Sequence, residues 1–209
     1  MDLREKALTA IELLKEAYPL PSCALESGSA YEFLIAVRLS AQCTDKRVNL
    51  VTPALFARFP TLEAFAGAEP EDVEPYIHSC GLAPSKARDI VGACRMLLTQ
   101  YGGTVPDTVE ELLKLPGVGR KTANLVCGDI YGKPAVVTDT HLIRIANRLG
   151  LVHTVDPYKV EKALRELLPP EESNDFCHRC VLHGRAVCAA RSPRCGACAL
   201  RDCCDWRAQ

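Results

Sequence analysis

The sequence of 209 residues lacks any run close to the ~20 consecutive apolar residues that a membrane-spanning helix requires. Its first stretch, MDLREKALTAIELLKEAYPL, lacks the basic start and apolar core of a secretion signal, and its spacing of apolar residues predicts an amphipathic helix. With 48% hydrophobic residues and a mean hydropathy of +0.01, the composition is typical of a soluble globular chain. We therefore expect a cytoplasmic protein that does not enter a membrane.

An excess of charge is also missing, because the net charge is only −1. This excludes a strongly basic protein that coats nucleic acid by charge alone, although a balanced total can hide a polarised surface. Residues 59–85 contain five acids and no Lys or Arg, whereas residues 112–148 contain six Lys or Arg and two acids. The second segment therefore predicts an electropositive face.

Strand patterns are absent too, since no alternation of apolar and polar residues lasts more than a few positions. Helical spacing recurs instead, and turns that contain Pro or Gly interrupt it at short intervals. We predict helices from about residue 30 to 41 and over 45–59, 61–66, 70–77, 84–101 and 158–168. The expected fold class is all-α.

One stretch, LPGVGRKTANLVCGDIYGKPAVVTDTH at residues 115–141, places a Gly-rich turn between two helical patterns. The first helix is expected to be capped by Asp107 and to end at Pro116. Gly117 and Gly119 permit positive φ angles and remove side chains that would keep an anion away. The free N–H groups at the start of the second helix then face outward. This pattern predicts a helix-hairpin-helix that holds a DNA phosphate without reading sequence, although any packed helix pair can use a Gly turn.

Two polar residues of this stretch carry candidate chemistry, and each also has a simpler explanation. Lys121 lies at the edge of an apolar stripe, where its methylenes can pack while the amine reaches a cleft; most helical lysines are simply solvated. Asp139 stands at the N-terminus of a third helical pattern that ends at Gly150, so it can be a helix cap. Capping amides also keep a carboxylate ionised, which is compatible with a catalytic role.

LPGVGRKTAN followed by VTDTH resembles the endonuclease III branch of the helix-hairpin-helix DNA glycosylases, and the resemblance extends from about residue 3 to residue 206. It implies that Lys121 is the catalytic lysine and Asp139 the catalytic aspartate. It also implies two domains: a six-helix barrel over residues 22–132, and a second domain formed by residues 1–21 plus 133–209. The active site would lie in the groove between them.

Seven of the twelve cysteines follow residue 176, which favours metal ligation over disulfides in a chain without a secretion signal. Four thiolates in a short loop can hold one cluster, and the family spacing implies a [4Fe–4S] cluster on Cys188, Cys195, Cys198 and Cys204. The adjacent Cys203 is left out by that spacing. A zinc site on Cys177, Cys180, Cys195 and Cys198 is the alternative.

The other cysteines have the simpler role of small packing residues. Cys177 and Cys180 are expected to pack along a helix. The remaining five are expected in the core: Cys23, Cys43, Cys80, Cys94 and Cys127.

Damage chemistry on a base requires the nucleotide to be extruded, so the gap in the duplex must be filled. By the resemblance, Gln42 pairs with the orphaned base and Leu82 forms an apolar wedge. Their simpler roles are a polar surface residue and a buried loop anchor. Phosphate contacts are expected from Gly117, Gly119, Arg120, Arg185, Arg191 and Arg194, the alternative for the arginines being a solvated polar face.

The resemblance implies a bifunctional DNA glycosylase and abasic-site lyase that acts as a monomer on double-stranded DNA with damaged pyrimidines or abasic sites. Two alternatives remain open. A monofunctional glycosylase of the same superfamily lacks a lysine at the position of Lys121 and carries an early-helix acid that AVRLSAQCTD does not offer. A non-catalytic DNA-binding module would need no pair of Lys121 and Asp139.

Overall fold

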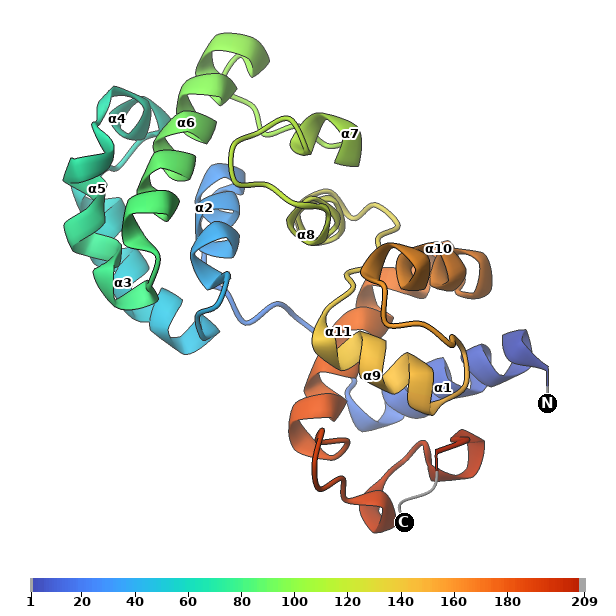
Figure 1. Ribbon diagram of the computed structural model, residues 1–209. Helices are drawn as coiled ribbons and strands as arrows, with labels where there is room; N and C mark the ends of the chain where they lie inside the picture. Colours follow the sequence, from blue (N-terminus) through green and yellow to red (C-terminus); the bar gives the residue numbers. More distant parts are fainter. Residues whose placement is uncertain (1, 207–209) are drawn as a thin grey trace. The chain divides into compact units, whose positions relative to one another are not determined.

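The computed structural model describes residues 2–206, and these form only helices and connecting segments (Figure 1). The predicted all-α fold class is therefore confirmed. The α-helices are α1 Leu3–Ala17, α2 Ala30–Ser40, α3 Asp45–Arg58, α4 Leu62–Gly67, α5 Pro70–Ile77, α6 Ala83–Tyr101, α7 Val109–Leu112, α8 Arg120–Tyr131, α9 Thr140–Arg148, α10 Pro157–Leu167 and α11 Ser173–Ala186. The short 3₁₀ helices are η1 His78–Cys80, η2 Pro170–Glu172, η3 Cys195–Ala197 and η4 Arg201–Cys203. None of the helices in this part of the chain is long and apolar enough to cross a bilayer.

The chain divides into two compact units. One is the continuous segment Ala24–Tyr131, which we call the hairpin unit. The other combines the described residues up to Cys23 with those from Gly132 onward, and we call it the cysteine-loop unit. The second unit therefore joins segments from both ends of the sequence.

In the hairpin unit, the long helix α6 packs against α4 and α5, as Figure 1 shows. Its apolar residues recur at helical spacing, and they are all buried: Ala87, Ile90, Val91, Cys94 and Leu97. Helix α2 lies against α3, α6 and α8. The α2–α8 contact attaches the second helix of the Gly turn to the core of this unit.

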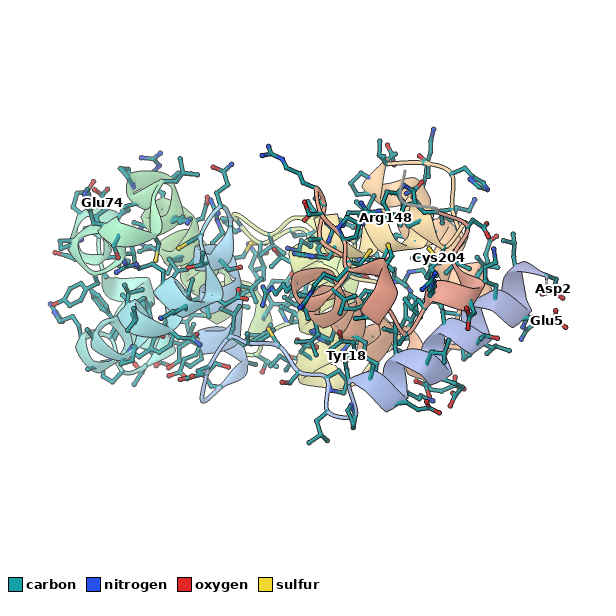
Figure 2. The ribbon with its side chains drawn as sticks, turned by 90° about the horizontal axis from the view of Figure 1, so that it is seen from below. Asp2, Glu5, Tyr18, Glu74, Arg148 and Cys204 are labelled. Atoms are coloured by element: carbon teal, nitrogen blue, oxygen red, sulfur yellow. The ribbon has the colours of Figure 1, made fainter. Side chains whose placement is uncertain are left out.

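In the cysteine-loop unit, α11 packs against α9 and α1. Helix α1 begins with a capping box, in which the Glu5 amide donates to Asp2 Oδ1 (2.8 Å) and the Asp2 amide donates to Glu5 Oε2 (3.1 Å). Figure 2 labels both residues at the start of the helix. Its buried face, which includes Ile11 and Leu14, covers α11 and η4.

Most predicted helices lie within two residues of their observed bounds, but three expectations were wrong. Thr108, not Asp107, caps α7, because Thr108 is extended and its hydroxyl accepts from the Glu111 amide (3.3 Å). Helix α7 ends at Leu112 rather than at Pro116, and a tight turn continues from there. Cys23 and Cys43 are half-exposed instead of buried, because they lie in connecting segments.

Candidate active site and cysteine loop

The Gly turn joins α7 to α8 through a series of short backbone hydrogen bonds. The Leu115 amide donates to the Leu112 carbonyl (3.1 Å), and the Val118 amide donates to the Leu115 carbonyl (3.2 Å). The Gly119 carbonyl then accepts from the Ala123 amide (2.9 Å), which is the first bond of α8. The amides of α8 that precede Ala123 have no carbonyl to bind within the helix and lie at the positive end of its dipole.

Gly117 is required by the packing below the turn. Its φ angle is +73°, and a Cβ atom there would lie 2.6 Å from Arg38 Nε and 2.7 Å from Asp89 Cβ. Arg38, from α2, donates through Nε (2.9 Å) and Nη2 (2.5 Å) to Asp89 Oδ2 of α6. The turn therefore rests directly on an ion pair between two core helices.

Gly119 differs from Gly117, because a Cβ atom there would meet no heavy atom within 4 Å. The start of α8 therefore faces open space, beside the exposed side chains of Arg120 and Lys121. Outward amides, a helix dipole and two cations together form a surface suited to an anion such as a phosphate. Lys121 is solvent-exposed, as most helical lysines are.

Gln42 and Leu82 share an unusual backbone conformation. Their φ angles are 55° and 53°, and they are the only non-glycine residues in the described part of the chain with positive φ. Gln42 follows α2 and is exposed, whereas Leu82 precedes α6 and exposes 54% of its surface. The simpler explanation of Leu82 as a buried anchor is therefore wrong, because a large apolar side chain is held in solvent.

Asp139 caps α9, as the sequence predicted. Its Oδ1 accepts from the Leu142 amide (2.7 Å), and its side chain is half-buried. The extended segment before it is held by α11, because the Val137 amide donates to Cys177 Sγ (3.3 Å) and the Ala135 amide donates to Ser173 Oγ (3.1 Å). Asp139 belongs to the cysteine-loop unit and Lys121 to the hairpin unit.

His141 lies in the first turn after Asp139. Its Nδ1 is 3.0 Å from Arg144 Nη2. Burial lowers the pKa of His141, the Asp139 carboxylate and the Gly184 carbonyl act to raise it, and Arg144 and Arg185 add to the lowering. The net result is a lowered pKa for His141, which favours its neutral form.

Three of the four predicted cluster ligands, Cys195, Cys198 and Cys204, line one cavity of about 580 Å³. Burial raises the pKa of the Cys198 thiol, and the charges of the other three thiols raise it further. Cys188 is one of these three thiols, although it does not line the cavity.

In the described residues, no three His, Cys, Asp or Glu side chains converge closely enough to hold one metal ion. Cys177 and Cys180, which belong to the alternative zinc set, are buried in α11. Both cysteines pack along a helix, as expected.

Three residues around the loop were not identified from the sequence. Arg148 Nη1 donates to Cys188 Sγ (3.1 Å), its carbonyl lies 3.2 Å from Cys204 Sγ, and its guanidinium covers the Trp206 ring at 4.3 Å. Figure 2 labels Arg148 and Cys204 in this unit. Arg144, one turn earlier, donates to the Cys188 carbonyl (2.9 Å). Two arginines four positions apart on α9 therefore hold both ends of the loop, a spacing that could have indicated the contact.

The third residue is His183 of α11, which is buried. Its Nε2 lies 3.3 Å from Cys198 Sγ, and its Nδ1 lies 3.2 Å from the Tyr18 hydroxyl. The other predicted phosphate contacts, Arg185, Arg191 and Arg194, are exposed. Arg194 also donates to the Ala186 carbonyl at the end of α11, so part of its role is to close the loop.

Comparison with known proteins places this geometry in context. Residues 35–170 match the family described as "HhH-GPD superfamily base excision DNA repair protein". The chain is 46% identical over 202 residues to endonuclease III of Synechocystis sp., covering 96% of this chain and 92% of the relative. It is 41% identical over 204 residues to endonuclease III of Escherichia coli, covering 98% of this chain and 97% of the relative.

Solved structures give the same result. The chain matches a trapped endonuclease III–DNA covalent intermediate with a TM-score of 0.92 and 41% identity, over 98% of this chain and 97% of that one. It matches a non-covalent endonuclease III–DNA complex with a TM-score of 0.91 at the same identity, over 98% and 96%. A thermostable thymine-DNA glycosylase shares the fold at 23% identity, with a TM-score of 0.82 over 97% and 95% of the two chains.

Proposed function

This chain belongs to the endonuclease III family of the HhH-GPD superfamily of base excision DNA repair proteins, and we propose that it removes oxidised or ring-saturated pyrimidines from double-stranded DNA. It is a bifunctional DNA glycosylase and abasic-site lyase. The observation that carries this conclusion is the full-length match to an endonuclease III trapped covalently on DNA. A covalent intermediate requires a nucleophile on the protein, and this chain has Lys121 directly after its hairpin turn.

In the proposed reaction, the Lys121 amine attacks C1′ of the extruded nucleotide, and the damaged base leaves with the electron pair of the glycosidic bond. Loss of a proton from the nitrogen and opening of the sugar ring give a Schiff base. Removal of a proton from C2′ then expels the 3′ phosphate by β-elimination, which cuts the strand. An ordinary lysine titrates near pH ~10.4, so the amine must lose a proton before it attacks.

Asp139 is the proposed acceptor of that proton, and its carboxylate also stabilises the positive charge that develops on the sugar. The hydrogen bond from the Leu142 amide supports this role, because it holds the carboxylate at the start of α9. The same contact fixes the side chain in one orientation. The capping function of Asp139 therefore assists its proposed chemistry.

The protein binds DNA, and we propose which residues make the contacts. The amides after Gly119, with Arg120, hold a phosphate near the nucleophile, which is supported by the open space at this turn. Arg185 and Arg191, with Arg194 to a smaller extent, make further phosphate contacts. Leu82 enters the base stack and Gln42 pairs with the orphaned base, which is supported by the exposure of both side chains.

We further propose that Cys188, Cys195, Cys198 and Cys204 hold a [4Fe–4S] cluster, which would serve chiefly to fix the loop. Arg144 and Arg148 would then orient the loop from α9, and His183 would donate to the Cys198 sulfur. The hairpin unit and the cysteine-loop unit are proposed to be the two family domains. A monomeric, cytoplasmic enzyme remains our expectation.

The test of this function separates Lys121 from Asp139. Lys121→Gln removes the atom that forms the Schiff base, so borohydride trapping and strand cleavage should both vanish while binding to damaged DNA survives. Asp139→Asn retains a good helix cap and deletes only the charge. A catalytic carboxylate predicts a loss of about 10²–10⁴-fold in single-turnover cleavage of a thymine glycol duplex.

Circular dichroism melts of both variants are the folding control. Full activity in Asp139→Asn would reduce Asp139 to a cap. A borohydride adduct retained by Lys121→Gln would refute the proposed nucleophile, and the absence of any adduct with the unaltered protein would favour the monofunctional or non-catalytic alternatives.

A further inference from the structure

Lys86 is a charged residue with no exposed surface, and the reaction described above does not use it. It lies in the first turns of α6, and its Nζ donates to two carbonyls, that of Leu39 (2.8 Å) and that of Cys80 (2.9 Å). An ammonium group has three donors and no acceptor, so both contacts are hydrogen bonds from the same charged nitrogen. Charged side chains are almost never fully buried unless they are paired in this way.

The two carbonyls belong to the two segments that carry the proposed filling residues. Leu39 lies in the last turn of α2, three positions before Gln42. Cys80 ends η1, two positions before Leu82, and the backbone amide of Lys86 itself donates to the Leu82 carbonyl (2.9 Å). One buried side chain therefore connects segments that are 47 and 6 residues away from it in sequence.

Both segments need such support because Gln42 and Leu82 are held in the left-handed backbone region. A residue with a side chain keeps this conformation only when its surroundings fix it, and such residues cluster at functional sites. The side chains of Gln42 and Leu82 are exposed, so they do not supply the constraint themselves. Lys86 contacts the backbone shortly before each of these residues, through the Leu39 and Cys80 carbonyls.

We propose that Lys86 is a positioning residue that holds the Gln42 and Leu82 segments at a fixed separation, so that both side chains enter the duplex together. The inference rests on the proposed filling roles of these two residues. Fixing both segments in advance reduces the conformational entropy that DNA opening would otherwise cost. Burial lowers the pKa of the Lys86 ammonium, and the thiols of Cys43 and Cys80 act against this lowering.

Arg95 provides a matched control on the same helix. Its Nε donates to the Ala66 carbonyl (2.8 Å) and its Nη2 to the Ala68 carbonyl (2.8 Å). Both acceptors lie at the end of α4, away from the two filling segments. Arg95→Met and Lys86→Met therefore each remove two hydrogen bonds between α6 and backbone carbonyls. Arg95→Met also removes an exposed ion pair with Glu69 (3.1 Å), but only Lys86→Met removes contacts to the segments of Gln42 and Leu82.

The experiment is single-turnover cleavage of a lesion duplex at a temperature where melts show that each variant is folded. We expect Lys86→Met to slow cleavage about tenfold, equivalent to about 1.4 kcal/mol, and Arg95→Met to stay within about twofold. The same substitution is then added to a Gln42→Ala, Leu82→Ala double variant. Because Lys86 acts through these residues, it should slow that variant by less than about twofold.

A Lys86→Met protein that is folded and cleaves at the unaltered rate would overturn the inference. The inference would also be overturned if Lys86→Met slowed the Gln42→Ala, Leu82→Ala variant as much as it slows the unaltered protein. A Gln42→Ala, Leu82→Ala variant that cleaves at the unaltered rate would overturn it as well. If Lys86→Met does not fold, Lys86→Gln, which keeps a donor and removes the charge, is measured against the same outcomes. Borohydride trapping by the unaltered protein comes first: no adduct refutes the proposed function, whereas an adduct with an unchanged Lys86 variant refutes only this inference.

Discussion

Substitution of the two turn glycines by alanine should affect different properties: Gly117→Ala should lower stability, and Gly119→Ala should weaken DNA binding. In Gly117→Ala, the backbone must keep a φ of +73°, which costs an L-residue about 1–2 kcal/mol. The new methyl group also lies 2.6 Å from Arg38 Nε and displaces the ion pair with Asp89, a loss of about 1 kcal/mol for a partly exposed pair. The sum is about 2–3 kcal/mol.

For a chain of this size, 1 kcal/mol lowers the melting temperature by about 2–4 °C. Gly117→Ala should therefore melt about 4–12 °C below the unaltered protein. Circular dichroism or differential scanning calorimetry measures this shift directly. A shift within the error of the melt would show that the hairpin moves away from Arg38 and Asp89 without cost.

Gly119→Ala should leave stability nearly unchanged, because its methyl group meets no atom within 4 Å. The loss of Gly at this helix start should cost less than about 1 kcal/mol. The methyl group does occupy the space in front of the α8 amides, so a phosphate loses hydrogen bonds of about 1.5–3 kcal/mol. Affinity for a duplex should fall about tenfold to a hundredfold in fluorescence anisotropy. Unchanged affinity and salt dependence would refute the assignment of this turn to phosphate binding.

Three further predictions concern other parts of the chain. Cys198→Ser should remove a cluster ligand and with it iron and solubility, whereas Cys203→Ser should retain both; iron analysis that finds the reverse would shift the ligand assignment by one residue. The pKa of His141 is lowered in the folded protein, so the unfolded chain binds a proton first as the pH falls. The contribution of neutral His141 to stability is therefore complete above pH ~6.5 and decreases below it. Melting curves of His141→Asn should therefore fall less steeply with acid than those of the unaltered protein, and parallel curves would contradict this. Arg191→Ala should flatten the plot of log affinity against log salt by ~1, and an unchanged slope would leave Arg191 as a solvated side chain.

The sequence predicted the elements whose apolar residues recur at a regular interval. Helix α6 is an example, since Ile90, Val91, Cys94 and Leu97 all face the core. Helix α11 was not delimited, because its buried face includes Ser173, Arg179 and His183, which hide the apolar period. Those polar residues are buried for specific partners, such as the Ala135 amide for Ser173. The spacing of apolar residues cannot predict hydrogen bonds to partners this distant in the sequence.

In the candidate site too, features set by neighbouring residues could be predicted, whereas contacts between distant residues could not. Local motifs identified the turn and the cap at Asp139, whose roles depend on the few residues around them. The Lys121 assignment came from resemblance, because an exposed lysine on a helix carries no local signal of its role. The bridge by Lys86 and the arginine contacts to the cysteine loop depend on side chains that meet across the fold. The spacing of residues along one helix does not predict contacts between residues 47 and 40 positions apart.

The composition of the cysteine-loop unit also determines the order in which the chain can fold during synthesis. Lys6 of α1 donates to Asp205 Oδ1 (2.6 Å), a contact between residues 199 positions apart, and to the Leu149 carbonyl (3.0 Å). The hairpin unit is continuous and can complete its own contacts once Tyr131 has left the ribosome. Helix α1, although it is made before the hairpin unit, meets α11 and η4 only after both have been made. During that interval its apolar face, with Ile11 and Leu14, is uncovered and available to a chaperone.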